Sequence, residues 1–253
     1  MKFDISNASD LDEALYIAPG RTQKQLELFM SEIPLQDDAT VLDVGAGRGR
    51  IAVPLAMKGY HVHAIDIDAH RLKIISELKG IHKLNNLTFE TADFFNKKFT
   101  TAVLPFAAII MSYAALSENS STAMHMLLSN CFRNLKDGGT FILDLLNRDY
   151  IVKNASTTPI DVTHRAERCL PEITSIVRTR LVDVLQSTEE NIYCVETIRG
   201  QELQIRYTQY LFDLETLSTY LKEEGFHIAK VFGNYDKSEY TNESSRIIII
   251  ANK

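Results

Sequence analysis

Cysteine is scarce in this chain of 253 residues, which holds three and spaces none of them as a CxxC pair. An odd number without that spacing gives little support for a disulfide framework or a structural zinc site. Long apolar runs are also missing, since nowhere do about eighteen apolar residues follow one another. Residues 1–16 lack the charged-then-apolar order of a signal peptide. We therefore expect a cytoplasmic protein with no membrane partner.

An excess of basic residues is absent as well, because the formal net charge is -6. This argues against non-specific binding of nucleic acid and leaves small molecules as the default partners. Hydrophobic residues make up 45% and charged residues 24%, as in ordinary soluble globular proteins. The length suits one large domain, or one domain that carries a sizeable insertion.

Short apolar runs alternate with longer amphipathic ones from residue 41 to about residue 145. This alternation is typical of repeated βα units around a parallel sheet. Strands are expected at 40–44, 61–66, 86–93, 106–113 and 140–146, and helices at 50–59, 69–80 and 124–139. Five strands with such crossovers predict a doubly wound α/β fold with helices on both faces.

After residue 150 the pattern changes to polar and β-branched residues in partial alternation, which favours half-solvated antiparallel strands. Such strands are expected at 162–170, 173–185, 191–200 and 202–212, then a helix at 213–226 and closing strands at 227–233 and 245–253. We therefore divide the chain into N-terminal helices with the first part of the core (1–150), an antiparallel insertion (151–210) and the remainder of the core (211–253).

The stretch "VLDVGAGRGR" at 41–50 places Gly45, Gly47 and Gly49 between an apolar strand and a helix. Glycines there allow a tight turn and the close approach of a ligand to bare main chain. Asp66 ends the second strand, where a carboxylate can accept both hydroxyls of a ribose. Asp68 looks more like the cap of the following helix.

Nicotinamide dinucleotides and S-adenosylmethionine both fit these features, and the spacing separates them. Dinucleotide folds favour GxGxxG, whereas this turn reads GxGxG and has Asp43 two places before its first glycine. A carboxylate there suits the sulfonium and ammonium of S-adenosylmethionine. After the third strand, Asp93 can accept the adenine amine while Phe94 or Phe95 covers a ring face, although simple core packing is favoured for Phe95.

The segments "VLDVGAGRG", "AIDID", "TADFF" and "LKDGGTFILD" resemble the class I S-adenosylmethionine-dependent methyltransferases in order and spacing. The resemblance covers about residues 35–148 and 213 to the end. It implies a Rossmann-like seven-stranded sheet of order 3214576 with strand 7 antiparallel. It also implies that Asp66 binds the ribose diol, that Asp93 binds the adenine amine and that the region before the glycines closes over the cofactor. Expected cofactor contacts are Arg21, Asp43, Gly45, Ala46, Gly47, Asp66, Ile67, Asp93, Phe94 and Met111.

A closer resemblance links residues 206–226 and 231–253 to small-molecule methyltransferases whose antiparallel insertion after strand five forms a lid. The chain departs from that subgroup in two ways. "FA" at 106–107 replaces the usual "FD", and no histidine follows strand four, where the sequence reads "YAALS". Because an amine needs only to arrive deprotonated, while a hydroxyl or carbon nucleophile usually needs a base, the missing histidine favours methylation at nitrogen.

Catalysis of in-line methyl transfer can come mainly from positioning and exclusion of water. Tyr16 and Tyr113 are the catalytic candidates. Ser112 and Tyr113 lie just beyond strand four, at the edge where open α/β sheets bind their ligands, and Tyr113 can orient a polar group of the substrate there. The resemblance places Tyr16 near the methyl donor, and Arg21 could meet the methionine carboxylate. Candidates for acceptor contacts in the insertion are His164, Arg165, Arg178, Arg180, Tyr207 and Tyr210, most of which we expect on solvated faces.

No metal site is predicted, because His61 and His63 lack carboxylates at a plausible ligand spacing, and His125 falls on a helix remote from the cleft. Arg48 is expected to face solvent, and Gly49 to permit close helix packing. O- or C-methylation of a small metabolite, a nicotinamide-dependent oxidoreductase and a non-catalytic S-adenosylmethionine-binding protein remain as alternatives. The sequence leaves a monomer and a homodimer equally open.

Overall fold

The computed structural model describes residues 8–16, 20–33, 39–96, 99–101, 103, 105–112, 120–166 and 170–253. Its core helices are α2 (Arg21–Glu32), α3 (Ala52–Met57), α4 (Ala69–His82), α6 (Ser121–Asn134) and α9 (Leu214–Glu223). Its core strands are β1 (Thr40–Val44), β2 (His61–Asp66), β3 (Leu87–Thr91), β4 (Phe106–Ser112), β5 (Leu135–Leu146), β10 (His227–Phe232) and β11 (Arg246–Asn252). None of the helices in these ranges is both long and apolar enough to cross a membrane.

These strands form one seven-stranded sheet in the order β10-β11-β5-β4-β1-β2-β3. The first five strands along the chain pair in parallel, whereas β11 is antiparallel to both β5 and β10. The expected order 3214576 with an antiparallel last strand is therefore confirmed. Because β11 runs against β5, its first residue Arg246 pairs with Leu146 at the carboxyl edge of the parallel strands.

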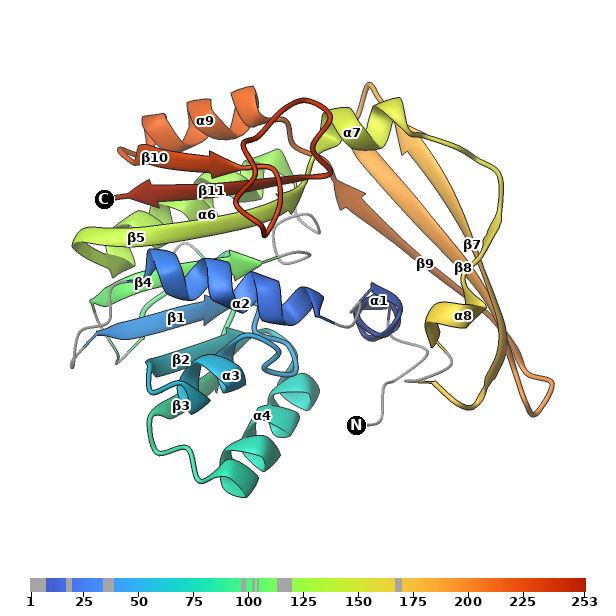
Figure 1. The fold of residues 1–253 in the computed structure, drawn as a ribbon, viewed down its shortest axis with the longest axis horizontal. Coiled ribbons are helices and arrows are strands. Elements are labelled where there is room, and N and C mark those ends of the chain that lie inside the picture. The colour runs from blue at the N-terminus through green and yellow to red at the C-terminus, as the bar shows by residue number, and fades with distance from the viewer. Residues whose placement is uncertain are drawn as a thin grey trace.

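Helices cover both faces of this sheet, as Figure 1 shows. On one face α2, α3 and α4 pack against a buried cluster that includes Phe29, Val41 and Ile75. On the other face α6 and α9 pack against a second cluster that includes Leu127 and Leu217. Burial on both faces explains why β4 and β11 read as almost continuous apolar runs. The carboxyl edge of β1, β4 and β5 points toward the second part of the molecule (Figure 1).

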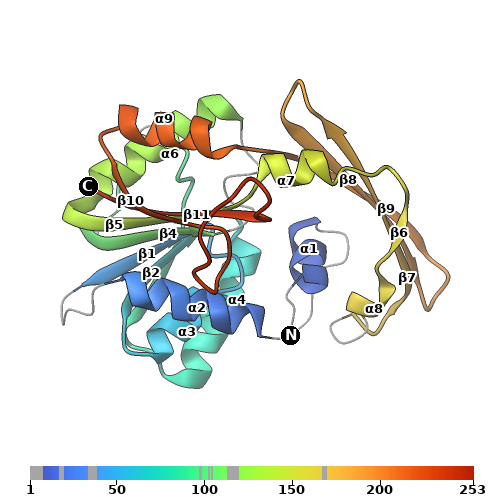
Figure 2. The ribbon, with the colours of Figure 1, turned by 45° about the horizontal axis from the view of Figure 1, so that its top comes forward.

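The insertion forms a separate four-stranded sheet in the order β6-β7-β8-β9, which we call the lid sheet. It consists of β6 (Ile160–Asp161), β7 (Ile173–Asp183), β8 (Thr188–Thr197) and β9 (Glu202–Tyr210), with α7 (Arg148–Lys153) and α8 (Thr163–Ala166) beside it. Helix α1 (Ala8–Tyr16) lies between the lid sheet and the core in both Figure 1 and Figure 2. Leu11 and Leu15 of α1 share a buried apolar cluster with Tyr193 and Val195 of β8.

Two expected elements differ in the structure. Helix α6 ends at Asn134 rather than near residue 139, since the Asn134 side chain donates to the main-chain oxygen of Asn130 and Leu135 begins β5 opposite Phe106. Residues 163–166 form helix α8 where a strand was expected. The Asp161 carboxylate accepts from both the main-chain N–H and the hydroxyl of Thr163, as helix-capping side chains do, and this favours the helical turn.

Substitution of Gly49 can measure how tightly the glycine turn packs against α3 and α4. Its φ is +83°, and a Cβ there would lie 2.8 Å from Val53 Cγ2 and 2.9 Å from Ile75 Cγ1. Gly49→Ala should lower the free energy of unfolding through backbone strain of about 1–2 kcal/mol and overpacking of about 1–3 kcal/mol. Denaturant titration of both proteins measures the loss.

The matched control is Gly59→Ala, because Gly59 has a φ of +96° but nothing within 4 Å of the added carbon. That variant should show only the loss due to strain, about 1–2 kcal/mol. Equal losses in the two variants would show that Gly49 is required for its backbone conformation alone.

Candidate active site

The glycine turn lies at the carboxyl edge of β1. The Ala46 N–H donates to the Ile65 oxygen at 2.9 Å, which fixes the turn against β2. Gly47 has a φ of +54°, and a Cβ there would meet the guanidinium of Arg71 at 3.0 Å. Glycine is therefore required at position 47 for two reasons, the positive φ and the close approach of the Arg71 side chain. Gly49 contacts Val53 and Ile75 as described above, in line with its expected role in helix packing.

Asp66 ends β2 beside this turn and is 7% exposed. Its Oδ2 accepts from the Gly47 N–H at 2.7 Å, and its Oδ1 accepts from the Asp68 N–H at 2.8 Å. Since a carboxylate offers about four lone-pair positions, each oxygen keeps room for one more donor. Asp68 caps α4 as expected, because its side chain accepts from the main-chain N–H groups of His70 and Arg71.

Asp43 lies on β1 and is 2% exposed. Its Oδ2 is buried and has no hydrogen-bond partner among the described residues. Burial raises the pKa of Asp43 to about 7, nearby Asp66 adds to the rise, and the charge of Arg50 and the Ala52 N–H oppose it. A buried carboxylate with an unpaired oxygen is costly on its own, and a cationic ligand would relieve that cost. The carboxylates at this edge therefore fit a positively charged ligand group.

Asp93 follows β3. The preceding residue, Ala92, donates its main-chain N–H to the main-chain oxygen of Asp66 at 3.0 Å, and this bond brings Asp93 to the end of β2. Asp93 is exposed, and one of its oxygens accepts from the Phe95 N–H at 2.9 Å. Ile67 directly after Asp66 is 72% exposed, which is unusual for a large apolar side chain beside buried strands. Asp66, Ile67 and Asp93 thus come together at one edge.

The side chains of two expected cofactor contacts, Phe94 and Met111, are buried. Phe94 is 3% exposed and packs edge-on against Phe99 at 4.7 Å, so its ring belongs to the core. Phe95, for which core packing was expected, is half-buried and packs against the same apolar cluster. Met111 is 1% exposed, and its sulfur lies 4.0 Å from that of Cys131. The side chains of Phe94 and Met111 both lie in the apolar cluster on the face covered by α6, and the contacts of these residues with the cofactor stay predictions.

A buried polar network lies beside Asp43 under helix α2. The carboxylate of Asp144 on β5 is 0% exposed and accepts from Gln25 Nε2 at 2.7 Å, from the Tyr235 hydroxyl at 2.9 Å and from Arg246 Nε at 2.7 Å. Gln25 in turn accepts from Arg50, whose charge acts on Asp43. Burial and the neighbouring Asp144 raise the pKa of Tyr235. The network joins α2, β5 and β11 beneath the site.

Helix α1 meets the glycine turn through charged side chains. Asp10 is 3% exposed and accepts from Arg48 Nε at 3.0 Å, and its Oδ1 lies 3.3 Å from Arg71 Nε. Glu13 accepts from Arg71 Nη2 at 2.9 Å. Arg48 is therefore 5% exposed, and the expectation that it faces solvent is wrong because Asp10 supplies a buried counter-charge.

The remaining candidates near the edge are placed only in part. Arg21 begins α2, and its guanidinium carbon lies 5.9 Å from the centre of the Tyr235 ring. Tyr16 ends α1, but its side chain lies outside the described residues, as does the whole of Tyr113. Ser112 ends β4 and is half-buried. The catalytic roles of Tyr16 and Tyr113 therefore stay predictions.

The histidines take other partners. His63 contacts Thr88 and Glu90 on β3. The ring of His125 on α6 packs at an angle of 51° against that of Tyr220 on α9, with the ring centres 4.2 Å apart. In the lid, His164 and Arg165 are exposed, whereas Arg178, Arg180 and Tyr207 lie half-buried on β7 and β9.

Sequence reasoning missed the network around Asp144 and the polar pair Glu189 and Asn191 on β8, both 0% exposed. A signal existed for Asp144, since a single carboxylate interrupts the apolar run of strand 140–146 and therefore needs a buried partner. No comparable signal marks Glu189 or Asn191.

Comparisons with known proteins agree with this geometry. Residues 35–206, more than half of the chain, match the family described as "Methyltransferase domain". A stretch of 96 residues is 34% identical to an uncharacterized protein of Haemophilus influenzae, and it spans 37% of this chain and 34% of that protein.

Two solved structures are similar over almost their whole length. The CcbJ methyltransferase of Streptomyces caelestis is 17% identical, with a TM-score of 0.79 over 93% of this chain and 90% of that one. CalS10, an amino pentose methyltransferase of Micromonospora echinaspora, is 14% identical, with a TM-score of 0.69 over 100% of this chain and 99% of that one. At these identities the likeness shows a shared fold. The match over residues 35–206 shows that the chain belongs to the methyltransferase domain family.

Proposed function

We propose that this protein transfers the methyl group of S-adenosylmethionine to an amine nitrogen of a small molecule. The observation that carries the proposal is the unpaired, buried Oδ2 of Asp43 beside the glycine turn. That oxygen suits a cationic cofactor, whereas the pyrophosphate of a dinucleotide would be repelled by it. The family assignment makes the protein an S-adenosylmethionine-dependent methyltransferase, and the choice of nitrogen is the further step.

The residues of the carboxyl edge divide the work of holding the cofactor. Asp66 accepts from the ribose hydroxyls, Asp93 accepts from the adenine amine and the exposed Ile67 covers a face of the adenine. Asp43 pairs with the positive charge of the methionine portion, and Arg21 is the candidate for its carboxylate. When bound, S-adenosylmethionine supplies a methyl group on a positively charged sulfur. The protein then has to orient the acceptor in line with that methyl group and exclude water.

Nitrogen is favoured because the sequence offers no histidine after β4 to remove a proton from a hydroxyl. CalS10, which has a similar fold, is described as acting on an amino pentose. The acceptor then has to reach the carboxyl edge from the side of the lid sheet, since α2 and α6 cover the two faces of the core sheet.

Replacing Asp66 tests the cofactor site. Asp66→Asn removes the charge and half of the acceptor capacity, so it should weaken binding of S-adenosylhomocysteine by about tenfold or more, or about 1.4 kcal/mol. Calorimetric titration measures the affinity. Asp68→Asn is the matched control, because asparagine still caps a helix and Asp68 is not proposed to touch the cofactor. Unchanged affinity in Asp66→Asn would refute this assignment of the ribose site.

The raised pKa of Asp43 makes cofactor binding depend on pH. Below about pH 7 the free carboxyl is protonated, and pairing with an ammonium group requires that proton to leave. The affinity for S-adenosylhomocysteine should therefore fall by up to about tenfold per pH unit as the pH drops from about 7 to 5. Calorimetry in two buffers of different ionisation enthalpy should detect the released proton.

Asp43→Asn is the control for this pH dependence. The variant should bind S-adenosylhomocysteine more weakly and without the pH slope. Because the folded-state pKa of Asp43 is raised above the ordinary value of an aspartate, the stability of the unliganded wild type should decline as the pH rises from about 4 to 7. The variant should lack that decline as well. An unchanged pH slope in Asp43→Asn would assign the titration to another group.

The choice of nitrogen is tested with matched acceptors. Radiolabelled S-adenosylmethionine is incubated with pairs of small molecules that differ only in carrying an amine or a hydroxyl, such as an amino sugar and its parent sugar. Label should pass to the amine member alone, and faster as the pH approaches the pKa of that amine. Label on the hydroxyl member would show O-methylation instead.

A further inference from the structure

The lid sheet carries a polar group on one face of its end nearest the core. Paired residues of antiparallel strands share a face, and the register aligns Arg180 with Asn191 and Tyr207, and Glu189 with Gln209. We call Arg178, Arg180, Glu189, Asn191 and Gln209 the basal cluster. Glu189 and Asn191 are 0% exposed and Gln209 is 5% exposed, so this is the buried face of the lid sheet.

Within the basal cluster the oxygens of Glu189 and Asn191 all accept hydrogen bonds, and one buried donor has no partner among the described residues. Glu189 accepts from Arg180 through one oxygen and from Gln209 through the other. Asn191 Oδ1 accepts from Arg178 Nε at 2.9 Å. Asn191 Nδ2 is buried and has no hydrogen-bond partner in the part of the chain that the structure describes. A guanidinium only donates, so the amide cannot be turned the other way, and the unpaired group is an N–H₂ donor.

An unpaired buried donor costs about 1–3 kcal/mol and is rare in native proteins, so it calls for a hydrogen-bond acceptor that the described residues do not supply. The basal cluster holds two arginines and one glutamate, and hence a formal excess of one positive charge. The unpaired donor and the two guanidinium groups together favour an oxygen acceptor that is negatively charged.

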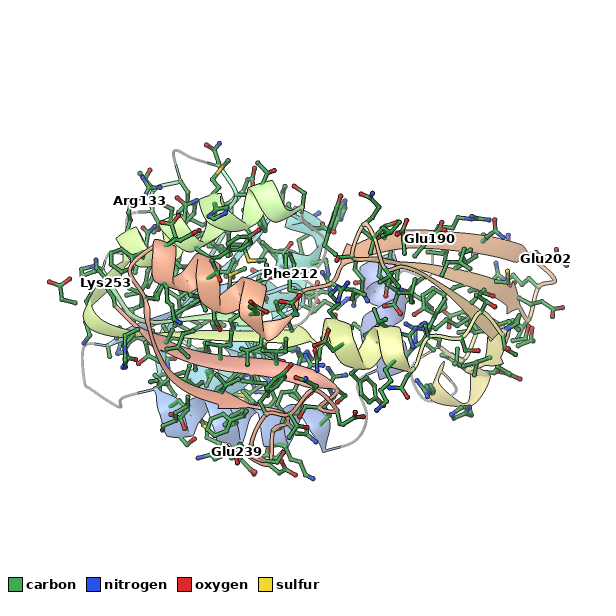
Figure 3. The ribbon with its side chains drawn as sticks, turned by 90° about the horizontal axis from the view of Figure 1, so that it is seen from above. Arg133, Glu190, Glu202, Phe212, Glu239 and Lys253 are labelled. Carbon is green, nitrogen blue, oxygen red and sulfur yellow. The ribbon has the colours of Figure 1, made fainter. Side chains whose placement is uncertain are left out.

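The position of the basal cluster in the fold indicates that this negatively charged oxygen belongs to the substrate that receives the methyl group. Gln209 is three residues before Phe212, which pairs with Asn147 at the carboxyl end of β5. In Figure 3 Phe212 lies where β9 reaches the core, whereas Glu202 marks the far end of the lid sheet. At about 3.3 Å per residue, Gln209 lies about 10 Å along the strand from that junction.

The same face farther from the core is already occupied. Tyr193, Val195 and Ile205 pack against Leu11 and Leu15 of α1 in the third apolar cluster. The buried charged and amide side chains of the basal cluster therefore lie at the end of this face beside the carboxyl edge, where the proposed cofactor site lies.

We propose that the basal cluster binds an anionic oxygen group, carboxylate or phosphate, of the methyl acceptor, with Asn191 as the specificity-determining donor. This rests on the proposed function for the statement that the ligand is the acceptor. The substrate class is thus a small amine that also carries a carboxylate or phosphate.

Anion binding is tested by NMR on the protein saturated with S-adenosylhomocysteine. The side-chain amides of Asn191 and Gln209 are followed while inorganic phosphate or acetate is added at constant ionic strength, with chloride as reference. A saturable shift with phosphate, with acetate or with both is expected, and the stronger response identifies the group. No saturable shift with either anion would overturn the proposal.

Two variants of equal charge change complete the test. Asn191→Asp replaces the donor by an anionic oxygen and should weaken anion binding, read at Gln209, by about tenfold or more. Gln204→Glu adds the same charge to an exposed position of β9 that pairs with Cys194 on the opposite face, and it should change the affinity by less than about twofold. Equal loss in both variants would overturn the role of Asn191.

Methyl transfer separates this inference from the proposed function. Wild type should methylate an amine that carries carboxylate or phosphate with a lower KM than its neutral analogue, and Asn191→Asp should lose that preference. S-adenosylhomocysteine should bind both proteins equally in calorimetry. If the wild type fails to bind S-adenosylhomocysteine, the proposed function fails, while anion binding at Asn191 is still decided by NMR on the unliganded protein.

Discussion

The carboxylate of Asp10 joins the three parts of this molecule. It is buried between Arg48 of the glycine turn and Arg71 of α4, where two guanidinium groups offset the cost of removing its charge from water. This pairing fixes one side of α1 on the glycine turn, while Leu11 and Leu15 on its other side pack against the lid sheet. A helix of nine residues thus links the glycine turn to the lid sheet.

The core could be predicted because its signals are local. Strand, glycine turn and the cap at Asp68 each depend on residues a few positions apart, and a right-handed βαβ crossover then leaves few arrangements of the strands. The order of the last two strands came from the resemblance and not from periodicity, since "IIIIA" alone does not reveal that β11 runs antiparallel. The positions of Asp43 and Asp66 followed for the same reason, because both lie at strand ends fixed by that pattern.

The rest depends on partners that are far apart in the sequence. Arg48 meets Asp10 across 38 positions and Arg246 meets Asp144 across 102, so neither pair leaves a trace in any local window. Asn191 lies in a strand whose alternation predicts which residues share a face, but not which face is covered. That is decided by α1, which packs onto one side of the lid sheet, and it turned expected solvated arginines into members of a buried polar group.

The two ends of the lid insertion meet at one point. Asn147 pairs with Phe212, and the Arg148 N–H donates to the Phe212 oxygen at 3.1 Å. A segment whose ends are neighbours can be exchanged between related proteins without stretching the core, much as a loop is grafted onto a scaffold. Here the exchangeable unit has two pieces, because α1 lies outside the insertion yet forms part of its apolar interface. A chimera that transplants residues 148–211 alone would place a new lid sheet against a mismatched helix, so the lid sheet and α1 have to be exchanged together to keep this interface.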